Sequence, residues 1–180
     1  MASESLVTKL NIDVAATYKN VLDLGSNPEN TSLSAAIVIA DGSGTSQADT
    51  VWSDSRDYTV GHTNFDLNAM LQLNTDGDTV RTLNFANLKL VAIRSKESAG
   101  GSGYAEIGGG TDGGAAADAW AGITTMFKVD AAITSVYPGG LLVWYNPTGG
   151  TVTGTSADIF HIEAVTANQE LDIMLIGDHV

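Results

Sequence analysis

Apolar and polar positions alternate with a period of two over several short stretches of the chain. In residues 6–14, Leu10 and Ile12 share one parity, and Lys9 and Asn11 share the other. Such alternation is typical of a β-strand with one buried face. The same pattern, or a short apolar run bounded by turn residues, predicts further strands around Leu83 and Phe85 and at residues 33–40, 51–60, 88–94, 104–107, 141–145, 158–165 and 171–176.

Residues that favour turns separate these strands. The strongest turn signals lie at residues 25–30, 41–44, 76–78, 138–140 and 146–150. Residues 64–73 fit either a strand or one helical turn. Residues 115–127 are the best helix candidate, because Trp120, Ile123 and Phe127 have helix-like spacing. The pattern predicts an all-β fold, namely a single-domain antiparallel β-sandwich or jelly roll with at most one short helix.

The chain shows no linker and no internal repeat. Residues 1–5 are polar and precede the first predicted strand, so we expect a flexible N-terminal arm there. Residues 6–180 then form one domain. A chain of 180 residues can bury a sizeable core without disulfide bonds.

Composition excludes several classes of partner and site. The absence of cysteine excludes disulfides, thiolate metal sites and a cysteine nucleophile. No apolar run reaches the roughly 18 residues of a membrane span, and no basic and apolar leader opens the chain. We therefore expect no membrane partner, no signal peptide and synthesis in the cytoplasm.

The charge balance argues against nucleic acid as a partner. The formal net charge is −13, from 21 acidic and 8 basic residues. A phosphate backbone is repelled by such a surface unless basic residues gather in one place. They are instead scattered along the chain, at Lys9, Lys19, Arg56, Arg81, Lys89, Arg94, Lys96 and Lys128.

One pair of side chains has the spacing of metal ligands. His161 and Glu163 lie at i and i+2 on a predicted strand and so point to the same side. The sequence offers no obvious third ligand, and an ordinary His–Glu pair on a solvated sheet face is the preferred interpretation. His179 is expected to be disordered or at an interface. We predict no metal site, no cofactor site and no catalytic residue.

Other candidate motifs lack the spacing that their chemistry requires. Residues 74–78 do not match a twelve-residue calcium loop, and a hairpin turn is the better interpretation. Residues 42–44 are not a nucleophile elbow, and the glycine-rich segment 99–114 lacks the ending of a phosphate loop. We therefore expect a protein that is not an enzyme.

The three tryptophans are candidates for a recognition surface. Trp144 lies in an apolar run, which favours a place in the core. Trp52 and Trp120 are less constrained, and either could anchor a protein interface. If both were exposed on one concave face, they would instead favour a sugar-binding platform.

From Ala48 onward the chain resembles a group of small structural proteins of tailed bacteriophages and prophages. The resemblance is an order of strands and turns, not a set of reactive residues. Its features are a tryptophan-containing segment (49–56), a strand leading into a glycine-rich insertion (88–97), a break at 138–140 before residues 141–143, the segment 158–163, and a closing strand at 173–177.

This resemblance implies a virion component and carries over no catalytic residue. The expected role is a capsid decoration (cement) protein, which binds the major capsid protein or other virion proteins and stabilises the head shell, commonly as a homotrimer. A head-fibre, tail or adaptor component of the virion is one alternative. A carbohydrate-binding jelly-roll module or adhesin is another.

Overall fold

The computed structural model describes residues 6–22, 25–73, 79–96, 103–108, 119–120, 122–127, 133–154 and 157–180. The expected arm at residues 1–5 and most of the glycine-rich segment lie outside this part of the chain. The assignment of residues 6–180 to one domain stays a prediction. None of the helical segments in the described ranges has the length and apolar character that a membrane-crossing helix requires.

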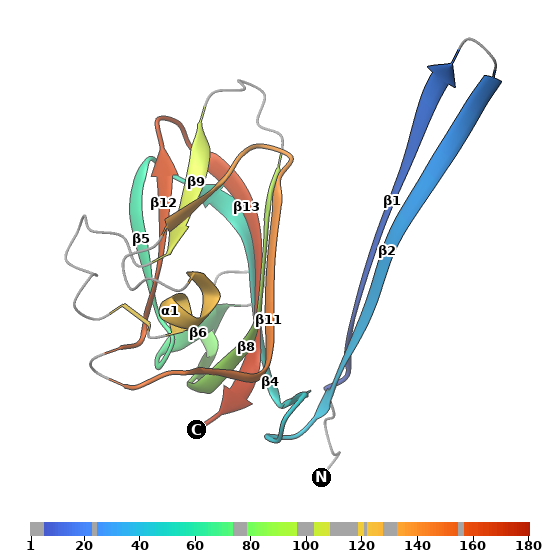
Figure 1. The fold of residues 1–180 in the computed structure, drawn as a ribbon. Helices are drawn as coiled ribbons and strands as arrows, with labels where there is room; N and C mark the ends of the chain where they lie inside the picture. Colours follow the sequence, from blue (N-terminus) through green and yellow to red (C-terminus); the bar gives the residue numbers. More distant parts are fainter. Residues whose placement is uncertain are drawn as a thin grey trace.

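Eight strands form two four-stranded antiparallel sheets that face each other (Figure 1). The first sheet has the order β10 (Ile133–Val136), β9 (Tyr104–Gly108), β12 (Ile159–Val165), β5 (Gly61–Asp66). The second has the order β11 (Leu141–Thr151), β8 (Phe85–Ser95), β13 (Gln169–His179), β4 (Thr50–Tyr58). The antiparallel β-sandwich expected from the sequence is therefore confirmed.

The strand pairs of the sandwich are nested within one another. β4 pairs with β13, β5 with β12, β8 with β11, and β9 with β10. A long hairpin folded over on itself produces this nesting, which is the arrangement of a jelly roll. The smaller hairpin of β6 (Met70–Leu73) and β7 (Thr79–Leu83) lies outside the nested pairs.

Alternation along the strands fills the space between the sheets. Phe160 and Ile162 of β12 and Leu171 and Ile173 of β13 are all buried in one apolar cluster. The predicted strand at 51–60 corresponds to β4, and its two aromatic residues of equal parity contact Phe65 from the opposite sheet. The period-two pattern thus identified the core-facing residues of these strands.

The predicted helix is present but shorter than its pattern suggested. Within the described residues, α1 spans Gly122–Phe127, and the backbone of Trp120 donates instead to Ile159. Gly122 weakens the helix, yet it is required, since a Cβ there would come within 1.9 Å of the Trp120 ring. The ambiguous segment 64–73 divides between β5 and β6, and the predicted turn at 146–150 lies inside β11 beside a register shift.

The N-terminal strands pair with each other and leave the sandwich. β1 (Thr8–Leu22) and β2 (Gly25–Asp41) form an antiparallel hairpin with unbroken pairing, which projects from the sandwich in Figure 1. The predicted turn at 25–30 is wrong, because these residues belong to β2. Pro28 is compatible with this strand, since a two-stranded ribbon leaves one side of each strand without ladder bonds.

A buried lysine attaches the hairpin to the sandwich. Lys89 of β8 is 1% exposed, and its Nζ lies 2.6 Å from the carbonyl oxygens of Gly44 and Gln47. Gly44 lies in the connection between β2 and β3, and Gln47 is the first residue of β3 (Gln47–Ala48). The third donor of the ammonium group contacts the buried carboxylate of Asp178 in β13, also at 2.6 Å.

Replacing Lys89 with methionine is expected to lower the free energy of unfolding by about 3–5 kcal/mol, because it leaves the buried carboxylate of Asp178 without its cation and removes one donor from each of two carbonyls. Urea unfolding followed by circular dichroism measures this loss. Lys9→Met on the exposed hairpin surface is the matched control and should change stability by less than about 0.5 kcal/mol. A double variant, Lys89→Met with Asp178→Leu, should recover part of the loss, whereas no recovery would contradict the pairing.

Candidate functional site: the hairpin and the adjoining sheet face

The hairpin has one apolar face and one polar face. The register pairs Leu10 with Ile37 and Thr8 with Ile39, so these side chains share one face. Lys9, Asn11 and Asp13 occupy the other face, where Ser34 Oγ donates to Asp13 Oδ1 over 2.5 Å. The alternation of β1 was visible in the sequence, but its pairing with β2 was not. The apolar run at residues 33–40 indicated a buried strand, and this interpretation is wrong, because most of these residues are exposed.

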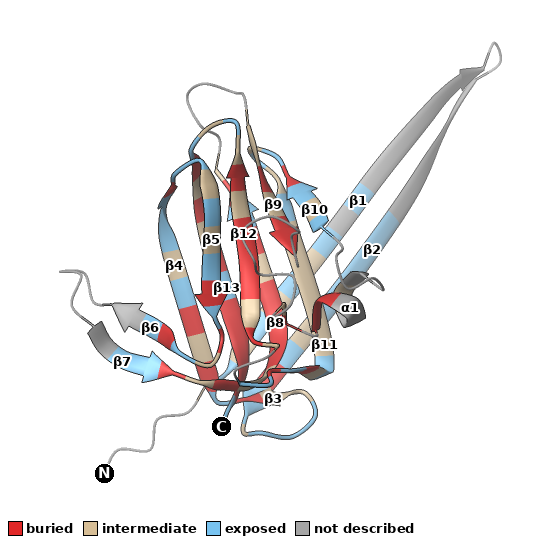
Figure 2. Cartoon of the chain, turned by 90° about the vertical axis from the view of Figure 1, so that its left-hand side faces the viewer, coloured by how far each residue is buried: buried red, intermediate tan, exposed pale blue. Residues whose placement is uncertain are grey.

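Side chains on the apolar face of the hairpin become more exposed with distance from its root. At the root, Ile39 is fully buried in a small second core, against which Leu10 and Ile37 pack. Farther along the same face, Ala35 is exposed and Leu33 is 64% exposed. Figure 2 shows the contrast between the sandwich strands, rich in buried residues, and the described part of the hairpin, which is mostly exposed or intermediate. The apolar face therefore extends beyond the surface that covers it.

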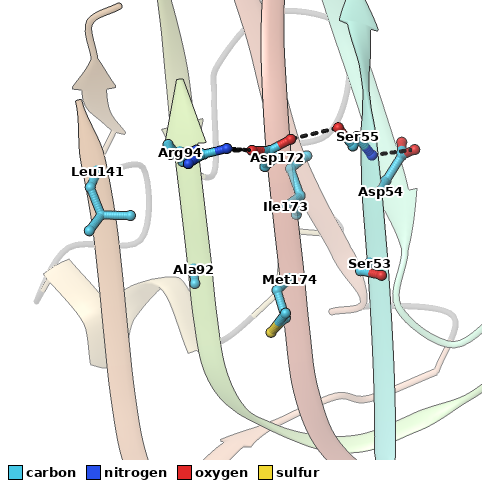
Figure 3. Close-up of a pocket in the computed structure, with 9 residues that line it drawn as sticks. All are labelled: Ser53, Asp54, Ser55, Ala92, Arg94, Leu141, Asp172, Ile173 and Met174. Carbon is cyan, nitrogen blue, oxygen red and sulfur yellow. Dashed lines mark hydrogen bonds and ion pairs between the residues drawn. The ribbon is translucent and has the colours of Figure 1, made fainter. Parts of the chain in front are cut away.

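On the sheet beside the root, apolar side chains also become more exposed with distance from the root. Leu90 of β8 and Ile176 of β13 are buried in the second core, beneath the hairpin. Farther along the same face, Met174 is 42% exposed and Leu141 is 66% exposed. With Ala92 they line an open pocket of about 400 Å³, shown in Figure 3. The hairpin and the sheet thus each carry an apolar surface without cover.

Charged groups border this pocket at one end. Asp172 accepts hydrogen bonds from Ser55 Oγ at 2.6 Å and Arg94 Nε at 2.9 Å, and Lys96 Nζ lies 3.1 Å away (Figure 3 shows the first two partners). The Ser55 hydroxyl is the main cause that lowers the pKa of Asp172 to about 2. Lys96 and Arg94 lower this pKa further, and partial burial opposes them. Asp172 is therefore held as a carboxylate at the rim.

The predicted His–Glu pair has a third neighbour. His62 of β5 lies directly opposite Glu163 of β12, and its Nδ1 is 3.2 Å from His161 Nε2 and 3.4 Å from Glu163 Oε2. The expectation of a solvated pair is wrong for His161, which is 2% exposed. The sequence could not show His62 as a partner, because the register between β5 and β12 is a long-range property.

The tryptophans do not form a recognition surface. Trp52 and Trp120 are buried in the main core, and Trp144 packs edge-on against Trp120 with ring centroids 5.5 Å apart. The indole N–H groups of the two buried residues have hydrogen-bond partners: Trp52 Nε1 donates to Leu71 O and Trp120 Nε1 donates to Thr151 O, both at 3.0 Å. The interface role considered for Trp52 and Trp120 is therefore wrong. The two side chains are also not exposed on a concave face, which a sugar-binding platform would require.

Comparison with known proteins provides no further guide to this surface. No protein-family model, no curated protein and no solved structure matches the chain. The candidate site is therefore defined by its geometry: an apolar hairpin face, the partly covered sheet face beside its root, and a charged rim.

The hydrogen bond from Ser55 predicts a low pKa for Asp172, which can be measured. Because the folded-state pKa is lowered, ionised Asp172 stabilises the folded state fully above the unfolded pKa near 3.8, and this contribution is lost as the pH falls through about 2. Titration of the Asp172 carboxyl carbon by NMR should show a midpoint near 2, which Ser55→Ala raises. Ser53→Ala, on the same face of β4, should leave it unchanged. A midpoint that ignores Ser55→Ala would contradict this cause.

Proposed function

We propose that this chain is a non-enzymatic structural protein of a bacteriophage particle, a capsid decoration protein that assembles through its β1–β2 hairpin. The observation that carries the proposal is the apolar hairpin face that extends beyond the sheet covering its root. The phage setting rests on the resemblance of residues 48–180 to tailed-phage structural proteins, and the jelly roll is a fold that capsid proteins use among many others.

The hairpin requires a partner on energetic grounds. The 15 residues of β1 extend for about 50 Å at about 3.3 Å per residue. An isolated two-stranded hairpin is marginally stable in water, because it buries too little apolar surface to offset the ordering of its backbone. Among the hairpin side chains that the structure describes, those at the root pack against the sandwich, through Ile39 and the residues around it, while Leu33 and Ala35 are exposed. A neighbouring protein that covers Leu33 and Ala35 would supply the missing burial.

The partner that we propose first is a second copy of the same chain. Each copy offers both halves of one contact: the uncovered hairpin face, with Leu33, and the uncovered sheet face, with Met174 and Leu141. The hairpin of one copy then lies on the sheet of the next, and this head-to-tail contact closes into a ring. We propose a ring of three copies, which fits the three-fold positions of a phage head.

The hairpin contact predicts a loss of assembly when its apolar face is charged. Leu33→Asp should weaken association at least tenfold, about 1.4 kcal/mol, because the carboxylate would be buried without a partner. Light scattering across a dilution series measures the change from trimer to monomer. Ser32→Asp adds the same charge to the opposite face of β2 and is the matched control. Equal behaviour of the two variants would contradict the proposed contact.

A mixing experiment separates head-to-tail assembly from a contact between two hairpins. A Leu33→Asp chain keeps an intact sheet face, and a Met174→Asp chain keeps an intact hairpin. Each variant alone should remain monomeric, while an equimolar mixture should form a heterodimer through the one intact contact. If the mixture remains monomeric, the head-to-tail arrangement is wrong.

Binding to phage heads tests the decoration role itself. Heads purified without this protein should bind the wild-type chain at saturable sites and become more resistant to heat, because binding to the assembled shell stabilises it by mass action. Leu33→Asp should bind more weakly than Ser32→Asp. A wild-type chain that ignores such heads, whatever its oligomeric state, would contradict the decoration role.

A further inference from the structure

We infer that His62, His161 and Glu163 form a binding site for a divalent transition-metal ion of the zinc class. The inference does not depend on the proposed function, since the site lies on the sheet opposite the one that faces the hairpin. Its basis is the distances among three ligand atoms, the burial of one histidine and the charges around the cluster.

The separations of His62 Nδ1 from the other two ligand atoms match tetrahedral coordination. His62 Nδ1 lies 3.2 Å from His161 Nε2 and 3.4 Å from Glu163 Oε2, and all three atoms lie within 4.8 Å of one another. Ligands held about 2.0–2.2 Å from a zinc ion at tetrahedral angles lie about 3.3–3.6 Å apart. Small side-chain adjustments therefore bring all three onto one ion.

The backbone holds the three side chains on one face. Glu163 and His62 are direct cross-strand partners, and His161 lies diagonally from His62 on the same face. Phe160 and Ile162 alternate with them and point into the core. The site is therefore built on two paired strands and not on loops, which keeps the ligands in place before an ion arrives.

His161 has the second interaction that metal-binding histidines commonly show. Its Nδ1 lies 2.7 Å from Asn64 Oδ1, which can only accept a hydrogen bond. Nδ1 therefore carries the proton, and the lone pair of Nε2 faces His62. A hydrogen bond to the far ring nitrogen fixes the tautomer and the ring orientation of a metal ligand. Asn64 is the residue that provides it here.

The charge around the cluster also favours a cation. Glu163 lies directly opposite Glu106 of β9, so two carboxylates face each other across neighbouring strands. Like charges in this position repel each other, and a bound cation removes the penalty. His62 and Glu163 are 33% and 27% exposed, which leaves solvent access for water as the fourth ligand. Two imidazoles and one carboxylate favour zinc and its neighbours over magnesium or calcium.

Calorimetry on the untagged full chain, stripped with a chelator, tests the site. Zinc should bind once per chain with a dissociation constant of micromolar order or tighter, and millimolar magnesium should not displace it. Cobalt should give the intense visible absorption of a tetrahedral site. Absence of saturable binding, or binding that magnesium displaces, would overturn the inference.

Variants assign the binding to these residues. His62→Ala and Glu163→Gln should each weaken zinc binding at least tenfold, and Asn64→Ala about 10–100-fold through the loss of its hydrogen bond to His161. His179→Ala removes the remaining histidine of the chain and is the matched control, with binding unchanged. Circular dichroism confirms that each variant is folded. If His179→Ala weakens binding as much as His62→Ala, the proposed site is wrong.

Discussion

The arrangement of the molecule depends on one buried ammonium group. Lys89 extends from a central strand of the sandwich, and each of its three donors has an acceptor: two carbonyls of the connection after β2 and the carboxylate of Asp178. Desolvating such a charge costs several kcal/mol, and only a full set of acceptors offsets this cost. The connection must therefore adopt the conformation that presents Gly44 and Gln47. The root of the hairpin is fixed by the same contacts.

The β-sandwich and the β1–β2 hairpin differ in how they bury their apolar side chains. The jelly roll closes its own core, with satisfied tryptophan side chains and alternating strand residues. The hairpin gains little from its own pairing and depends on burial at Ile39 and on whatever covers Leu33. In the assembly that we propose, the surface left exposed in one copy is covered by another part of the same chain in the next copy, and this contact requires no reactive side chain.

Much of the sandwich could be predicted from the sequence, because strand alternation is local. Residues 158–165 and 171–176 have the alternating pattern that β12 and β13 bury. The nested pairing, the place of His62 beside His161 and the hairpin of β1 with β2 could not be predicted, since register joins distant residues. One signal for the attachment lies in the sequence: Lys89 stands between Leu88 and Leu90 in an apolar run, and a charge that is buried there needs partners.

The attachment of the hairpin also has a mechanical consequence. A pull on the hairpin reaches the sandwich through the connection that Lys89 holds, and Lys89 and Asp178 belong to β8 and β13. These are the two central strands of their sheet, each bonded to a neighbour on both sides. Tension is therefore shared between the outer strand β4, which the connection enters through β3, and the two central strands that hold the connection through Lys89 and Asp178.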